Sequence, residues 1–339
     1  MSERAPDQSS DSRLIIHNLV RTQDLRATFA ADVRDGLGTR PRRLFPKYFY
    51  DELGSQLFDA ICLLPEYYLT RAENEIFARY ADEIVSALDA EKKMSLLEMG
   101  SGSASKTRRI IEALLKRQRE LVFIPVDISP VALETSSRVL LQSYPELRIE
   151  AYASDYYDGL AALSRAPREG RTLALFLGSN IGNFDMEDAR RFLRALRGVL
   201  APNDALLLGA DLRKDPAILE AAYDDSLGVT AAFNLNLLAR INRELEADFN
   251  LRAFKHRAVY NDEIGRIEVY LESARAQAVS IRKLEMELAF DEGERIHTEN
   301  SYKYDLEGLS RLATATGFER TRTWLDSDER FSSNLFMAV

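Results

Sequence analysis

From Ser95 onward, short apolar runs alternate along the chain with segments whose apolar residues recur every three or four positions. The runs have the length of buried strands, and the recurring spacing is typical of amphipathic helices. Strands that alternate with helices favour a parallel sheet covered on both faces. The predicted strands are 95–100, 121–127, 148–155, 173–179 and 205–212, and the predicted helices between them are 105–118, 130–144 and 186–200.

The pattern changes after Asp211, where a mostly helical stretch, 216–248, leads into strands with a two-residue alternation. In RIEVYLES, the apolar residues Ile267, Val269 and Leu271 fall on one face of a strand. The turns NDEIG and DEGE predict antiparallel hairpins. A last helix near 306–316 and the apolar segments after it predict a return to the first sheet.

The segment before the first predicted strand is read as a polar tail followed by helices. Helical spacing begins at DLRATFAADVRDGL and returns in GSQLFDAICLL, and Thr70 with Glu73 has the spacing of a capping box that starts a further helix. Tyr67 and Tyr68 then lie in the connection before that helix. The first two dozen residues are polar and weakly patterned.

These patterns predict an α/β fold in which a mixed α+β lobe is inserted into a lobe built on a parallel sheet. The N-terminal helices are expected to pack on the inserted lobe. The expected division is a loose tail at 1–24, an inserted lobe at 25–71 and 212–303, and a sheet lobe at 72–211 and 304–339.

Composition and charge exclude several classes of function. With 46% hydrophobic and 29% charged residues, the chain has the composition of an ordinary globular protein. The net charge of -9 and the scattered arginine pairs disfavour nucleic acid as a partner. No apolar run approaches the roughly 20 residues of a membrane span, and the polar N-terminus does not resemble a signal peptide. We expect a cytoplasmic monomer without a membrane partner, in which the single cysteine, Cys62, packs in the core.

The stretch LLEMGSGSASKT resembles a strand that turns through glycines into a helix, a common way to hold a nucleotide. Gly100 and Gly102 supply two positions of a dinucleotide fingerprint, but Ser105 takes the place of the third glycine. Gly100, Lys106 and Thr107 match a phosphate-binding loop, in which Ser105 again replaces a required glycine.

A third interpretation, binding of S-adenosylmethionine (AdoMet), needs only a backbone that the ligand can approach closely. It also calls for a carboxylate after the second strand, for the ribose hydroxyls, and a polar group after the third, for the adenine. Asp127 and Asp155 end those two strands. Two acids at neighbouring carboxyl ends of a parallel sheet fit ligand binding along that edge, and together they favour AdoMet over ATP.

Five motifs then occur in a defined order, namely FPKYFYDELGSQLFDAICLLPEYYLTRAE, LEMGSGSASKT, FLGSNIGNF, AYDDSLGVTAAFNLNLLARINREL and HTENSYK. In these motifs the sequence resembles the histidine-specific, AdoMet-dependent methyltransferases, which trimethylate the α-amine of L-histidine to hercynine in the first step of ergothioneine biosynthesis. The resemblance implies a Rossmann-like class I methyltransferase sheet, AdoMet as methyl donor and L-histidine as small-molecule partner. The sheet lobe would then be the AdoMet-binding domain and the inserted lobe the substrate-binding domain.

The resemblance also implies the residues of the site. It implies cofactor contacts at Gly100, Gly102, Lys106, Asp127, Asp155 and Tyr156. It implies substrate contacts at Tyr67, Asn183, Tyr223, Glu299 and Ser301, of which Tyr67 and Asn183 would lie beside the reacting amine as catalytic residues.

Residue chemistry supports the substrate contacts independently. The period of a strand puts Glu299 and Ser301 on one face. A carboxylate that accepts an imidazole N–H, beside a hydroxyl for the other nitrogen, would read the edge of histidine. No metal is expected, since the three histidines are far apart in the sequence and lack ligand-like neighbours.

Three positions depart from the family pattern, which often has methionine at Val269, threonine at Asn180 and phenylalanine at Tyr156. A shorter side chain at Val269 leaves room for another aromatic amino acid, such as tryptophan. Glu299 argues against an indole, which has one N–H and no second polar nitrogen, so histidine stays the favoured substrate. A rival of another class is a nucleotide-binding regulator with a degenerate phosphate loop at 105–107.

Overall fold

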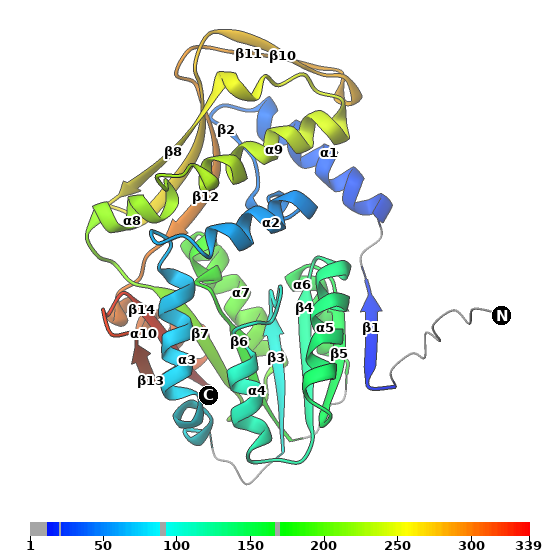
Figure 1. Ribbon diagram of the computed structural model, residues 1–339, viewed down its shortest axis with the longest axis vertical. Helices are drawn as coiled ribbons and strands as arrows, with labels where there is room; N and C mark the ends of the chain where they lie inside the picture. The colour runs from blue at the N-terminus through cyan, green and yellow to red at the C-terminus, as the bar shows by residue number, and fades with distance from the viewer. Residues whose placement is uncertain (1–11, 20–21, 89–92, 167–169) are drawn as a thin grey trace, which may run out of the picture.

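The fold is built on one large sheet and a smaller second sheet (Figure 1). The computed structural model describes residues 12–19, 22–88, 93–166 and 170–339. The large sheet has eight strands in the order β1-β5-β4-β3-β6-β7-β14-β13. Its strands are β1 (Leu14–Asn18), β3 (Met94–Met99), β4 (Leu121–Asp127), β5 (Leu147–Ala153), β6 (Arg171–Phe176), β7 (Ala205–Asp211), β13 (Phe318–Leu325) and β14 (Phe331–Ala338).

The large sheet is parallel except at β14, which runs antiparallel to both of its neighbours, β7 and β13. The parallel α/β fold predicted from the apolar runs is therefore confirmed, as is the return of the C-terminal strands to this sheet. Because β3 to β7 are parallel, their carboxyl ends meet at one edge. In Figure 1 this edge faces the second lobe.

Helices cover both faces of the large sheet, because neighbouring residues of a strand point to opposite faces. Leu96 belongs to one buried cluster and Leu97 to the other. The first cluster includes residues of α3 (Leu69–Ser86), α4 (Arg108–Leu115) and α5 (Pro130–Ser143), and the second includes residues of α6 (Tyr156–Leu163), α7 (Met186–Val199) and α10 (Leu306–Ala315). In the described part of the chain, no helix is long and apolar enough to cross a membrane.

The second lobe centres on a four-stranded sheet with the order β2-β12-β9-β8. Helices α8 and α9 pack on β8, and α2 packs on α9. A separate hairpin pairs β10 with β11. The elements of this lobe are α1 (Thr22–Gly38), β2 (Arg42–Arg43), α2 (Glu52–Ile61), α8 (Pro216–Tyr223), α9 (Val229–Leu245), β8 (Phe254–Asn261), β9 (Arg266–Ser273), β10 (Gln277–Ile281), β11 (Met286–Phe290), β12 (Arg295–Tyr302) and the 3-10 turns Pro46–Tyr48, Leu251–Ala253 and Arg282–Leu284.

The alternation predicted for RIEVYLES is confirmed in β9, where Ile267, Val269 and Leu271 are buried. The residues between them are half-buried. The face with the three apolar side chains is the one that the helices of the second lobe cover. The central strands β3, β6 and β7 of the large sheet are instead covered on both faces, and nearly all of their residues are buried.

The prediction of a loose tail over 1–24 is wrong for Leu14–Asn18. These residues form β1, which pairs in parallel with β5, and the ring of His17 stacks on Tyr152 with 4.5 Å between centroids. Five residues are too few to show a period, and the partner strand lies 133 residues away, so the strand is defined by tertiary pairing alone. The last residues of the predicted tail, 22–24, belong to helix α1, and residues 1–11 and 20–21 lie outside the described residues.

Two local predictions are also corrected. Helix α3 begins at Leu69 and not at a capping box, and its N-cap residue, Tyr68, makes no side-chain cap bond. Glu73 does not reach back to the cap, because its carboxylate is buried and bound elsewhere. The turn NDEIG does join the hairpin strands β8 and β9. The turn DEGE does not form a hairpin, because it links β11 to β12 and these strands belong to different sheets.

Candidate active site

The glycine turn between β3 and α4 is shaped for a close approach from outside. Gly100 has a φ of +73°, and a Cβ atom there would lie 2.8 Å from the hydroxyl oxygen of Tyr156 and 3.3 Å from Nδ2 of Asn180. Tyr156 itself is held by a ring contact with Phe176. Only glycine permits both this backbone conformation and this crowding, so the turn, Tyr156 and Asn180 converge on one point.

Asp127, at the end of β4, holds the far side of the same turn. Its Oδ2 accepts the backbone N–H of Gly102 at 2.9 Å, and its Oδ1 accepts that of Ser129 at 3.0 Å. Burial raises the pKa of this carboxyl, and the backbone N–H groups oppose the rise. Each oxygen keeps a second lone-pair site. Asp155 differs, because it is exposed and its Oδ1 caps α6 by accepting from the N–H of Asp158 at 2.9 Å.

Lys106 lies at the same edge, with a partner that the sequence did not reveal. Its Nζ donates to Oε2 of Glu73 at 2.7 Å, and the Glu73 carboxylate also accepts the N–H of Gly178 at 3.0 Å. Glu73 is fully buried, and a Cβ at Gly209 would lie 2.2 Å from its Oε1. Glu73 therefore ties the loop after β3 to the loop after β6.

Two further groups beneath the turn fit a ligand of the AdoMet type. In the described residues, Glu98 Oε2 and Ser101 Oγ are buried and have no hydrogen-bond partner. Burial raises the pKa of Glu98 to about 8. The cationic amine of the methionine part of AdoMet would supply hydrogen-bond donors to both groups. The ribose hydroxyls would donate to the remaining lone pairs of Asp127. The residues of this edge fit AdoMet.

The 3-10 turn Asn180–Asn183 connects this edge to the second lobe. A Cβ at Gly182 would lie 2.7 Å from the backbone oxygen of Tyr302, at the end of β12. The hydroxyl of Tyr304 also donates to the carbonyl of Ile181 at 3.3 Å. The close backbone approach brings Asn183 to the strand that carries Glu299 and Ser301.

Glu299 and Ser301 lie on one face of β12, as predicted. In the antiparallel pairing with β9, Glu299 is opposite Val269 and Ser301 is opposite Ile267, both of which are buried. In the described residues, no hydrogen bond reaches the Glu299 carboxylate. Burial raises its pKa to about 7, and the charge of Lys303 opposes the rise. Glu299 is half-buried, and a half-buried carboxylate without a partner is poised to accept an N–H from a ligand.

Ser301 and Tyr223 belong to a buried ionic network. The Tyr223 hydroxyl and Ser301 Oγ are 2.7 Å apart, and Lys303 Nζ donates to both at 2.9 and 2.8 Å. Lys303 is also ion-paired with Oδ2 of Asp211 at 2.9 Å. Asp211 in turn accepts bonds from Tyr68 and from Lys214. The end of β7 in the large sheet is thus linked to the predicted substrate residues.

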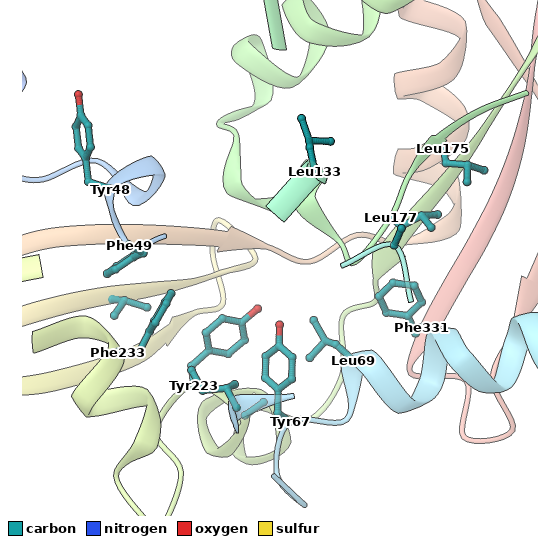
Figure 2. Close-up of a cluster of buried hydrophobic side chains, with 14 of the residues drawn as sticks. Tyr48, Phe49, Tyr67, Leu69, Leu133, Leu175, Leu177, Tyr223, Phe233 and Phe331 are labelled. Atoms are coloured by element: carbon teal, nitrogen blue, oxygen red, sulfur yellow. The ribbon is translucent and has the colours of Figure 1, made fainter. Parts of the chain in front are cut away.

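Aromatic side chains complete this region. The rings of Tyr67 and Tyr223 lie edge to face with 6.3 Å between centroids, and Figure 2 shows their hydroxyl groups directed to the same side. In the described residues, no hydrogen bond holds the Tyr67 hydroxyl. The rings of Tyr50 and Phe58 form an edge contact with each other. Burial raises the pKa of Tyr50, and the charges of Glu299 and Tyr156 raise it further, so residues predicted for the cofactor and for the substrate lie around one place.

Each of the three histidines is hydrogen-bonded to another residue of the protein. His17 bonds to Glu150, His297 bonds to Asn300, and His256 bonds to Asn234 and to the carbonyl of Tyr223. Burial lowers the pKa of His256, which favours the neutral ring.

The strand order, the glycine turn and the acids along one sheet edge together define a Rossmann-like class I AdoMet-dependent methyltransferase. Residues 29–338 match the model of the histidine-specific, SAM-dependent methyltransferase family. The chain belongs to this family.

Relatives with assigned names agree with the family match. The chain is 43% identical to a histidine N-alpha-methyltransferase of Mycobacterium tuberculosis, over 90% of this chain and 93% of the relative. It is 41% identical to the enzyme of the same name from Mycolicibacterium smegmatis, over 95% and 98% of the two chains. It is 33% identical to ergothioneine biosynthesis protein 1 of Neurospora crassa, over 85% of this chain and 32% of that protein.

Proposed function

We propose that this protein transfers methyl groups from AdoMet to the α-amine of L-histidine, three times in succession, to give hercynine in the first step of ergothioneine biosynthesis. The observation that carries the proposal is the unpartnered Glu299 carboxylate, on the same face of β12 as Ser301 and beside two tyrosines. In this proposal Glu299 accepts a ring N–H of histidine and Ser301 bonds the other nitrogen. A site of this kind rejects side chains that leave its polar groups unpaired.

The amine would be held by Tyr67 and Asn183. AdoMet, when bound, supplies an electrophilic methyl group on a sulfonium, so the transfer needs no nucleophilic side chain. Burial raises the pKa of Tyr67 far above the ordinary tyrosine value. Its hydroxyl therefore stays protonated at neutral pH and orients the amine as a hydrogen-bond partner, not as an anionic base. Positioning of this kind lowers a barrier by up to roughly 7–11 kcal/mol.

Each transfer would form an N–C bond as the C–S bond of the sulfonium breaks, with S-adenosylhomocysteine as the leaving group. The amine would release a proton to solvent before each transfer, and the third product is a permanent cation that the site must tolerate. The rings of Tyr50, Phe58, Tyr67 and Phe233 form a chain of edge and tilted contacts around the site. Aromatic faces attract methylated ammonium groups. We infer that these rings accommodate the growing cation.

Incubation with AdoMet and each of the twenty amino acids, followed by mass spectrometry, tests the proposal. Histidine should gain one, two and then three methyl groups, and the other amino acids should gain none. Methyl transfer to another amino acid in preference to histidine would contradict it. A Glu299→Ala variant in the same screen should lose the preference for histidine, whereas Glu287→Ala, at an exposed position of β11, should keep it.

A second candidate is the same reaction on another aromatic amino acid, such as tryptophan. It is favoured by Val269, whose short side chain lies directly opposite Glu299 in the sheet. The same screen separates the two candidates, because an indole offers only one N–H to this carboxylate.

The nucleotide-binding regulator has less support. Lys106, which would meet a phosphate, is already ion-paired with the buried Glu73. Magnesium-dependent ATP binding in calorimetry would revive this alternative. Three further properties stay predictions. Cell fractionation tests the cytoplasmic location, light scattering tests the monomeric state, and metal analysis tests the absence of a metal.

A further inference from the structure

Lys303, one residue after β12, lies behind the proposed substrate site and is fully buried. An ammonium group has three donors. All three are used here, for the Tyr223 hydroxyl, for Ser301 Oγ and for Asp211 Oδ2, at distances of 2.9, 2.8 and 2.9 Å. Lys303 therefore has no N–H left for a ligand, and any effect on the substrate must pass through its neighbours.

Lys303 limits the hydrogen bonds that the hydroxyls of Tyr223 and Ser301 can make to a ligand. A hydroxyl donates one hydrogen bond and accepts two. Tyr223 and Ser301 each accept one bond from Lys303, and one of their two protons closes the bond of 2.7 Å between them. One hydroxyl proton and one lone pair remain. The pair can thus serve a ligand that offers one acceptor and one donor.

The charge of Lys303 also acts on Glu299. Asp211 is paired with both Lys303 and Lys214, but of these two lysines only Lys303 also contacts Ser301, on the face of β12 that carries Glu299. Glu299 lies two residues before Ser301 on the same face of β12, and its carboxylate has no hydrogen-bond partner among the described residues. The titratable groups that interact electrostatically with it are Tyr50, Tyr67, Tyr223 and Lys303. Lys303 is the one cation in that set. It favours the ionised carboxylate, which accepts an N–H from the ligand.

We propose that Lys303 is a positioning residue for substrate recognition, which leaves the Tyr223–Ser301 pair with one free donor and one free acceptor and supplies a positive charge that acts on Glu299. The proposal rests on the proposed function, because it takes the ligand to be an amino acid with a polar ring. It explains why a lysine is buried two residues from a serine that reads the ring. Lys303 itself does not contact the substrate.

The test measures histidine binding by calorimetry in the presence of S-adenosylhomocysteine, between about pH 6 and about pH 9, where Glu299 is expected to titrate. Lys303→Met should weaken histidine binding about tenfold, since a charged hydrogen-bond donor is lost. It should also move the midpoint of the pH dependence upward by roughly one unit, because the stabilising charge near Glu299 is gone. S-adenosylhomocysteine should bind as in the wild type.

Lys214→Met is the matched control. Lys214 pairs with the same aspartate but does not contact Tyr223 or Ser301. This variant should keep both the wild-type affinity for histidine and the wild-type midpoint. Lys303→Arg keeps the charge but not the compact ammonium, so it should weaken histidine binding without moving the midpoint.

An unchanged midpoint in Lys303→Met, or an equal shift in Lys214→Met, would overturn the proposal. If Lys303→Met no longer binds S-adenosylhomocysteine, and is therefore misfolded, a midpoint shift in Lys303→Arg overturns it instead. Failure of the wild type to bind histidine at any pH contradicts the proposed function and is a separate outcome. The midpoint is the decisive quantity, because a lysine with a merely structural role would not move it.

Discussion

Replacement of Asp211 by asparagine tests the ionic network at the junction of the two lobes. Asp211 is fully buried and faces Lys303 and Lys214, whose side chains are 0% and 9% exposed. Asparagine keeps the size of the side chain and one acceptor oxygen. The substitution leaves two buried cations without a counter-charge.

The expected loss of stability follows from this burial. Removal of one partner of a buried ion pair costs about 3–5 kcal/mol, and the partial exposure of Lys214 points to the lower end, about 3 kcal/mol. A loss of this size lowers the melting temperature by about 4 °C in a chain of this length, because the entropy of unfolding grows by about 2.1 cal/mol/K per residue. Calorimetry or urea unfolding at neutral pH measures it.

The pH dependence of the free energy of unfolding is a second test of the same ionic network. The two lysines hold the pKa of Asp211 below its usual range, although burial opposes them. The ionised form is therefore favoured in the folded state. The ionised carboxylate contributes fully to the free energy of unfolding above the pKa of aspartate in the unfolded chain, about 4. This contribution is lost as the pH falls through the lower pKa of Asp211 in the folded protein. The difference between the wild type and Asp211→Asn should shrink in acid.

Asp204→Asn is the matched control for this prediction. Asp204 is also buried, at 5% exposure, but accepts only the backbone N–H groups of Thr172 and Ala201, so its replacement should cost about 1 kcal/mol. Adding Lys303→Met to Asp211→Asn removes one unpaired cation and should restore part of the loss. An Asp211→Asn variant as stable as the wild type, or no less stable than Asp204→Asn, would refute the reasoning.

Three further predictions concern the two halves of the site. Glu299→Ala should weaken histidine binding tenfold or more, on the order of the loss of a charged hydrogen bond, and leave S-adenosylhomocysteine binding nearly intact; equal loss of both in calorimetry contradicts its role. Asp127→Ala should do the reverse, because the carboxylate holds the N–H of Gly102, and an unchanged affinity for the cofactor product would exclude it from that site. Gly182→Ala places a Cβ 2.7 Å from the backbone oxygen of Tyr302, so it should slow turnover while cofactor binding persists; wild-type turnover would show that the turn tolerates displacement.

The sequence predicted those parts of the fold that local pattern determines. Apolar runs such as 121–127 became buried strands, and the alternation in RIEVYLES became β9 with one buried face. The strand Leu14–Asn18 was missed because its partner is remote in the sequence. The turn DEGE was misread because a turn sequence does not specify which strands pair across it.

For the site, the sequence identified individual residues but not the contacts among them. Asp127 lies at the glycine turn, and Glu299 lies on one face with Ser301, as their positions in the strands predict. The partnership of Lys106 with Glu73 was missed, because helix α3 and the turn before α4 meet only in the folded chain. Glu73 had instead been read as a capping residue. Lys303 stood in the motif HTENSYK, but no local pattern distinguishes a buried lysine from a solvated one.

The strand β1 has a consequence for the way the chain is made. Its partner, β5, leaves the ribosome more than a hundred residues later, since the residues that meet are 133 apart. The outermost position of the sheet can therefore be filled only after β5 has formed, which makes it a late step in folding. A chain shortened to begin after Asn18 would leave the backbone N–H and C=O groups of β5 open to a neighbouring molecule. Such a chain should self-associate as its concentration rises.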